Sequence, residues 1–296
     1  MVYTDNRTIE LNSYSGVKKN GTLNSSVDFN FTGLLKDESN IMRSYISIVN
    51  AQLPVSFYVI NASNNFINVQ TTGSTLQTIT IPKGNYNSLS LLTALNNALS
   101  AVSIACTISI NKSNGCLTFL NTSSPSITFY ATNTKMNYVL GFTDNLIITS
   151  SLTLTRPLNL LGVKRIAINS FHLATSGYTS YDLGFSNTLA TIPVDQAPFN
   201  MISYVNANSS NNLILRLKYI DAIDIQIVDE LGNYLDFNGI DWSITLILSV
   251  ERRDIEKSNI DLIQTIKDSQ IKEEPPQEEP PREESKDEQE LNILTK

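Results

Sequence analysis

The stretch DIQIVDELGNYLDFNGIDWSITLILSV, residues 224–250, begins and ends as β-strand and carries acidic side chains in its middle. In its second arm, apolar residues alternate with Ser and Thr over the two-residue period of a half-buried strand. Those apolar residues are Trp242, Ile244, Leu246, Leu248 and Val250. The first arm repeats this pattern, with Ile223, Ile225 and Ile227 on one face and Asp224 and Gln226 on the other. The pattern predicts two strands of a hairpin, each with one buried face.

The acidic middle of this stretch is either a cation site or a turn. Its carboxylates are Asp229, Glu230, Asp236 and Asp241. Calcium binds six to eight oxygens, but the spacing of these residues does not match the regular ligand loop with a closing glutamate. Gly232, Asn238 and Gly239 lie among them, and tight turns favour such residues for positive φ and side-chain capping. The composition therefore favours a turn over a metal site.

The rest of the chain has the same strand and turn composition. At 296 residues it is long enough for one large β domain or two smaller ones. About a dozen short strands are separated by polar turns, which indicates an all-β sandwich or barrel. One helix is predicted after residue 87, with Asn87 or Ser88 as its cap, and we expect it to pack across the mouth of the sandwich. Its apolar residues at helical spacing are Leu89, Leu92, Leu95 and Leu99. A shorter helix over 134–140 is expected to end at Gly141.

The two cysteines lie in a predicted hairpin. Cys106 and Cys116 flank TISINKSNG, with the reversal expected near Ser113, so that Ile110 faces Cys116 and Cys106 faces Leu120. The sulfurs are then about four residues out of register, roughly 13 Å apart, which is too far for a disulfide. We predict two free thiols, as in a reducing compartment.

The charge of the chain is concentrated at its C-terminal end. Residues 271–296 hold nine acidic and four basic side chains, a net of −5 of the chain's −7, which leaves −2 for residues 1–270. The run KEEPPQEEPPREESKDEQE contains no apolar residue, so we expect a disordered tail. Before it, residues 255–267 are predicted to form a short amphipathic helix through Ile260, Ile263 and Ile266. The chain ends in LNILTK, whose Leu291, Ile293 and Leu294 form either a solvated end or a hook that docks on a partner.

Several function classes are disfavoured by the composition. The nearly neutral remainder carries no basic stripe, so specific nucleic-acid binding is not expected. The N-terminus has no basic and then apolar leader, and no run of about eighteen apolar residues occurs, so neither signal peptide nor membrane span is expected. We therefore expect synthesis in the cytoplasm. His172 is the one histidine and reads as the end of a strand. No phosphate loop, dinucleotide fingerprint or cysteine pair at metal spacing occurs, so we expect no enzyme, metal or cofactor.

Taken together, five segments resemble the penton, or minor capsid, proteins of virophages and Polinton-like viruses. These segments are IPKGNYNSLSLLTALNNAL, CTISINKSNGCLTFL, MNYVLGF, RPLNLLGVKRIAINSF and IQIVDELGNYLDFNGIDWSITLILSV. The resemblance covers roughly residues 25–250. It implies a jelly-roll β-sandwich with one or two short helices, whose five copies close a ring at each icosahedral vertex beside major capsid protein neighbours. It also implies a loop-rich end outward, the termini toward the capsid interior, and synthesis in the host cytoplasm.

The resemblance and the residue pattern together give a domain plan. We expect an N-terminal arm over 1–24, a jelly-roll capsid domain over 25–254, and the amphipathic segment and Glu/Pro-rich tail over 255–296. Because a jelly roll needs only about eight strands, the surplus around 62–150 is assigned to an insertion or elaborated loop. A β-sandwich fibre head or lectin-like module for sugar or receptor is the alternative. The loop aromatics Tyr178, Tyr181 and Phe185 are its candidate contacts.

Overall fold

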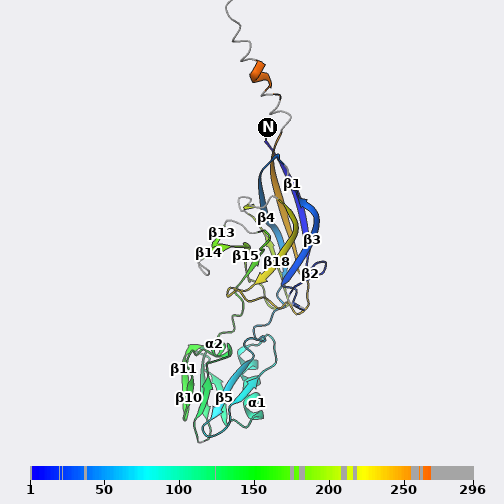
Figure 1. Cartoon of the computed structure of the whole chain (residues 1–296). Coiled ribbons are helices and arrows are strands. Elements are labelled where there is room, and N and C mark those ends of the chain that lie inside the picture. The colour runs from blue at the N-terminus through cyan, green and yellow to red at the C-terminus, as the bar shows by residue number, and fades with distance from the viewer. Residues whose placement is uncertain are drawn as a thin grey trace, which may run out of the picture.

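The structure is a computed structural model of the whole chain, shown in Figure 1. It describes residues 2–19, 21, 23–36, 39–123, 125–173, 177–179, 184–207, 212–215, 219–254, 260 and 263–267, with only the backbone described for 177–179 and 184–186. The described buried residues form two separate apolar clusters. We call the part around the first cluster, residues 2–57 and 163–253, the body. The part around the second cluster, residues 60–160, is called the insert.

The body is a sandwich of two antiparallel sheets. The first sheet has the order β1 (Val2–Asn12), β19 (Ser243–Arg253), β4 (Ile41–Pro54) and β16 (Met201–Val205), and β17 (Leu213–Leu215) also pairs with β4. The second has the order β15 (Thr188–Pro193), β12 (Arg165–Asn169), β18 (Ile220–Val228), β3 (Ser26–Leu35) and β2 (Val17–Lys18). Both sheets contribute alternate residues to one core, which is the arrangement of a β-sandwich. The predicted all-β class is confirmed.

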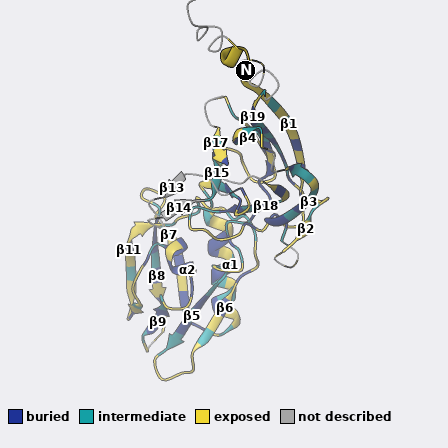
Figure 2. Cartoon of the chain, turned by 45° about the horizontal axis from the view of Figure 1, so that its top comes forward, coloured by how far each residue is buried: buried dark blue, intermediate teal, exposed yellow. Residues whose placement is uncertain are grey.

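The insert has its own two sheets and the helices α1 and α2. One sheet has the order β10 (Leu146–Ile148), β9 (Ile127–Tyr130), β5 (Phe66–Thr71) and β6 (Gln77–Thr80). The other has the order β11 (Ser151–Pro157), β8 (Cys116–Asn121) and β7 (Cys106–Ile110), with α1 (Ser88–Ala101) and α2 (Met136–Leu140) beside them. Figure 2 shows buried residues inside the insert as well as inside the body. The second cluster runs from Ile60 to Leu154, compared with the insertion expected around 62–150.

The two helices can be compared with the caps, apolar faces and ends that the sequence predicted for them. Asn87 caps α1, with its side chain accepting a hydrogen bond from the Ser90 N–H at 2.9 Å. The buried leucines of α1 are Leu91, Leu92, Leu95 and Leu99. Leu89, which was expected among them, is exposed because it lies in the first turn on the outer side. The expected position across the sandwich mouth is wrong, since α1 packs in the core of the insert. α2 ends as predicted at Gly141, whose φ is 92°.

The prediction that residues 224–250 form a hairpin is wrong. Its two arms lie in different sheets: β18 pairs with β3 and β12, whereas β19 pairs with β1 and β4. The acidic middle is therefore a connection between the sheets of the sandwich. The expected alternation within each arm is confirmed, because the five apolar residues of the second arm and the three isoleucines of the first are all buried.

The ends of the chain differ from the domain plan in one respect. Residues 2–12, expected as part of an arm, form β1 and pair along their whole length with β19. Because these residues form ladder hydrogen bonds with β19, they are the edge strand of the first sheet and not part of an arm. Residue 260 and residues 263–267 are helical, and Ile260, Ile263 and Ile266 are exposed. A separate pair, β13 (Gly177–Thr179) and β14 (Gly184–Ser186), lies between β12 and β15 in the chain.

Candidate functional site

The acidic connection between β18 and β19 is held as a series of turns. The Asp229 carboxylate accepts the N–H groups of Leu231 and Asn233, both at 2.8 Å. Asp236 accepts the N–H of Asn238 at 2.9 Å. Gly232 and Gly239 nearby have φ values of 81° and 79°, which side chains disfavour. The turn interpretation is confirmed for these acids.

Asp241 joins a different network, at the point where the connection enters β19. Its carboxylate accepts the Ser13 hydroxyl at 2.7 Å and the Asn24 amide at 3.0 Å. The Trp242 indole N–H donates to the Asn24 carbonyl at 2.6 Å, and the Trp242 backbone N–H donates to the Ser13 hydroxyl at 3.1 Å. We call these four residues the Trp242 lock. It joins the start of the chain to its last strand.

Asp224 is the centre of a second buried network. The strand pattern placed it on the polar face, but its side chain is only 3% exposed. It accepts the Ser170 hydroxyl at 2.8 Å, the Phe171 N–H at 3.0 Å and the His172 N–H at 2.8 Å. The His172 Nδ1 also lies 3.0 Å from Asp224 Oδ1. One carboxylate therefore fixes the turn that follows β12.

The electrostatics of Asp224 follow from these contacts. Burial raises the pKa of its carboxyl group, but the N–H groups of His172 and Phe171 and the Ser170 hydroxyl outweigh burial and lower that pKa below its ordinary value. The arrangement contains serine, histidine and aspartate but is not a nucleophile triad. In a triad the serine donates to the histidine, whereas here Ser170 donates to the carboxylate. The network is suited to holding a turn, as expected for a structural His172.

The cysteine hairpin forms with a register one residue away from the prediction. Ile110 pairs with Leu117 and Cys106 with Asn121, because the turn closes through the Asn111 N–H and the Cys116 carbonyl. Both cysteines are free thiols, as predicted, and both are buried. Burial raises the pKa of the Cys106 thiol to about 11, so it is unreactive near neutral pH.

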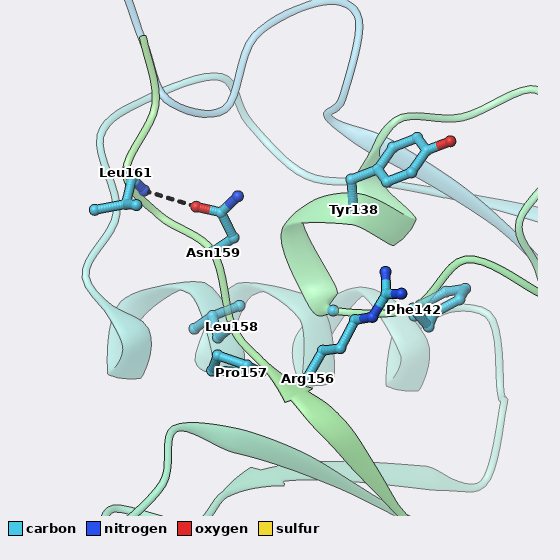
Figure 3. A pocket seen from close by; sticks show the side chains of 8 residues that line it. Tyr138, Phe142, Arg156, Pro157, Leu158, Asn159 and Leu161 are labelled. Atoms are coloured by element: carbon cyan, nitrogen blue, oxygen red, sulfur yellow. Dashed lines mark hydrogen bonds between the residues drawn. The ribbon is translucent and has the colours of Figure 1, made fainter. Parts of the chain in front are cut away.

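An open hollow lies on the insert, where α2 faces the end of β11 (Figure 3). Its volume is about 580 Å³, and its lining is Tyr138, Gly141, Phe142, Arg156, Pro157, Leu158, Asn159 and Leu161. Tyr138 is 61% exposed on α2, and Arg156 extends from β11 toward that helix. The Asn159 carboxamide oxygen accepts the Leu161 N–H at 3.2 Å and so shapes the rim. The lining of this hollow thus combines an exposed tyrosine, a guanidinium and an amide with apolar side chains.

No sequence pattern predicted this hollow, because its residues come from two separate segments that share no helical or strand periodicity. The loop aromatics that the sequence did indicate cannot be compared with it. Tyr178 and Phe185 lie on β13 and β14, which are described by their backbone alone, and Tyr181 lies outside the described residues. Leu291, Ile293 and Leu294 of the proposed docking tail also lie outside the described residues.

The part of the chain that the structure describes contains neither a metal-binding cluster nor a membrane-spanning helix. Within it, no group of three or more His, Cys, Asp or Glu side chains is arranged to hold a metal ion. None of its helices has both the length and the apolar character needed to cross a membrane.

Comparison with known proteins gave matches only among solved structures. No protein-family model and no curated protein sequence matches the chain. The chain is similar to the mavirus penton protein, with 14% identity and a TM-score of 0.43 over 84% of this chain and 100% of that one. It is also similar to a chain of the Sputnik virophage structure, with 14% identity and a TM-score of 0.39 over 83% of this chain and 97% of that one. Likenesses of this strength assign neither activity nor partners.

Proposed function

We propose that this chain is a structural capsid protein, a penton subunit that forms homopentamers at the vertices of an icosahedral virus. Its neighbours there are major capsid proteins, and its location is the virion after synthesis in the host cytoplasm. The observation that carries the proposal is the difference between the two ends of the body, one with the outer ends of β1 and β19 and the other with the insert. Val2 pairs with Arg253, so the start of β1 and the end of β19 lie at one end of the first sheet.

The insert leaves the same sheet at the opposite end. β4 starts beside these strand ends, with Ile41 paired to Arg252, and finishes at Pro54, shortly before the chain enters the insert. Its 14 residues place the two ends of the body about 40 Å apart. Figure 1 shows the same order, with the N-terminus at one end and the insert at the other. Such a subunit fits a vertex, with its termini among capsid neighbours and its insert outward.

The two sheets also leave the body with two different flanks. One flank carries the edge strands β1 and β2, and the other carries β15 and β16. When unlike flanks meet head to tail, the contact either closes as a ring or propagates as a filament. A two-fold dimer would instead require one flank to complement itself. The body therefore provides the kind of contact that a five-membered ring requires.

The test is the assembly state of the full chain over a range of concentration. Light scattering should give a particle of five times the 32.8 kDa chain mass, and electron micrographs should show five-fold rings. A variant that ends after residue 270 should form the same rings, because the body supplies the flanks. A stable trimer, or a monomer that stays single even with its capsid neighbours, would overturn the proposal.

A lectin-like or fibre-head module is the second candidate, and the hollow beside α2 is the observation that favours it. Exposed aromatic faces stack on sugars, and a guanidinium recognises a carboxylate on them. The full chain should then bind acidic sugars on a glycan array, and both Tyr138→Ala and Arg156→Ala should abolish that signal. An array without hits would remove this candidate and leave the capsid proposal intact.

A further inference from the structure

We infer that neighbouring copies meet through two exposed apolar patches on opposite flanks of the body. This inference rests on the proposed ring and assigns its contact residues. The first patch, called the Phe199 patch, consists of Phe199, Met201 and Val205, which are 77%, 45% and 69% exposed. The second, called the Tyr14 patch, consists of Tyr14 and Val17, which are 76% and 62% exposed. The occupant of each patch is the other patch, on a second copy of this chain.

The register of the first sheet puts Tyr14 of one patch and Met201 of the other at the same level. One row of paired residues crosses the sheet from edge to edge: Asn12, Ser243, Gln52 and Ser203. Tyr14 follows Asn12 by two residues at one edge. At the other edge, Met201 precedes Ser203 by two residues. Copies related by rotation about an axis along the strands must touch at equal heights, and Tyr14 and Met201 satisfy that condition.

The segments that carry the patches also occupy equivalent positions, since each connects an edge strand of one sheet to an edge strand of the other. Residues 13–16 connect edge strand β1 of the first sheet to edge strand β2 of the second. Residues 194–200 connect edge strand β15 of the second sheet to edge strand β16 of the first. Both connections cross the open side of the sandwich at the end nearest the insert, because Asn12 and Met201 both lie near the end of β4. Each flank therefore presents one crossing segment to its neighbour.

Phe199 has a backbone conformation that is unfavourable in the isolated chain. Its φ is 71°, in the left-handed region where a bulky side chain is unfavourable and Gly or Asn is common. Backbone hydrogen bonds hold it there, since its N–H donates to the Val55 carbonyl and the Val55 N–H donates to the Asn200 carbonyl, both at 2.8 Å. The ring itself lies mostly in solvent. A strained and exposed aromatic residue gains its compensation from a contact outside the monomer.

The charges beside the two patches are complementary. Asp195 is exposed in the segment that carries Phe199. Lys18 is exposed beside Val17 on β2. Opposite charges on two unlike flanks favour head-to-tail association and disfavour the meeting of like flanks. A second copy of this chain therefore fits each flank in apolar character, in the sign of its charge and in the level of Tyr14 and Met201.

The test is a charge exchange in the full chain, with assembly measured by sedimentation over a range of concentration. Lys18→Asp and Asp195→Lys should each shift the midpoint of assembly to about tenfold higher concentration. The double variant should restore it, because the two flanks then again carry opposite charges. Lys112→Asp, an exposed lysine in the β7–β8 turn of the insert, is the matched control and should leave assembly unchanged.

Phe199→Gly gives an independent arm. Glycine fits the left-handed backbone, so thermal stability of the monomer should be unchanged or higher while assembly weakens by about tenfold or more. Leu76→Gly, at a 52% exposed loop residue of the insert, is its control. If the native chain forms pentamers but all these variants match it, the contact residues are wrong and the pentamer stands. If the native chain forms no pentamer, the proposed function fails, and this inference fails with it.

Discussion

Replacing Asp224 should destabilise the body far more than replacing an acid that makes similar backbone contacts in solvent. Asp224→Ala removes the acceptor of two backbone N–H groups and of the Ser170 hydroxyl, and Ser170 is fully buried. Hydrogen bonds to a charged group contribute about 1.5–3 kcal/mol each, and a buried donor left unpaired costs about 1–3 kcal/mol. Because two of the donors are only partly buried, we expect a total loss of about 3–5 kcal/mol.

Asp229→Ala is the matched control for this substitution. Asp229 also accepts two backbone N–H groups, but at exposed sites where water replaces the lost acceptor. Its replacement should cost about 1 kcal/mol or less in the free energy of unfolding. The assay is denaturant unfolding followed by tryptophan fluorescence. Trp242 is the single tryptophan and is buried in the body, so the signal reports the body without the insert.

The pH dependence gives a second readout for Asp224. Its pKa is lower in the folded chain than its ordinary value of 3.8, so its ionised form stabilises the fold above that value. That contribution is lost as the pH falls through the folded pKa. The gap in stability between the native chain and Asp224→Asn, a neutral variant of similar shape, should therefore be full at pH 7 and shrink below pH 3.8. A gap that is constant with pH, or an Asp224→Ala loss equal to that of Asp229→Ala, would refute the reasoning.

Four other predictions concern separate parts of the chain. Gly141→Ala should lower the melting temperature of the insert, measured by calorimetry, because a Cβ there would lie 2.6 Å from a β11 carbonyl oxygen at a φ of 92°; an unchanged insert transition would contradict this. Asn96→Asp should destabilise α1 against β7 by about 1–3 kcal/mol, because the carboxylate keeps the bond from the Ile108 N–H but cannot donate to the Ile108 carbonyl and repels it; an equal stability by urea unfolding would argue against it. Cys106 and Cys116 should be silent to a thiol reagent in the native chain and count as two thiols after unfolding; a count of zero would indicate a disulfide. Limited proteolysis should remove residues 271–296 first and leave a β-rich core, because charged segments without apolar residues are preferred sites of cleavage; a tail that resists protease would show that it folds onto the rest.

Sequence alternation predicted the strands well and their partners poorly. Trp242 and the apolar residues after it were assigned to a buried face because the side-chain period of a strand is a local property. That β18 and β19 belong to different sheets is not local. It depends on whether the long connection between them folds back on its own sheet or crosses the core. The same polar, glycine-containing composition serves both outcomes.

Buried polar residues were missed for the same physical reason. Asp224 alternates with isoleucines as a solvent-facing residue would, and its burial comes from a turn more than fifty residues earlier in the chain. Asn96 resembles any polar position on a helix, yet it donates to and accepts from the backbone of Ile108 and so covers the open edge of β7. The cysteine register missed by one residue because the turn closes through Asn111, and a two-residue period gives no position for the turn itself.

The Trp242 lock bears directly on the proposed contact between copies. The Tyr14 patch lies on a short crossing segment, and such a segment would ordinarily sample several conformations and lose entropy on binding. Here Ser13 is bound to Trp242 and Asp241, so the residue before Tyr14 is fixed to the last strand. The opposite flank is fixed in the same way, because Val55, just after β4, accepts the Phe199 N–H and donates its own N–H to the Asn200 carbonyl. Both partners are therefore ordered before they meet, and the binding free energy of the apolar side chains is not spent on ordering the segments that carry them.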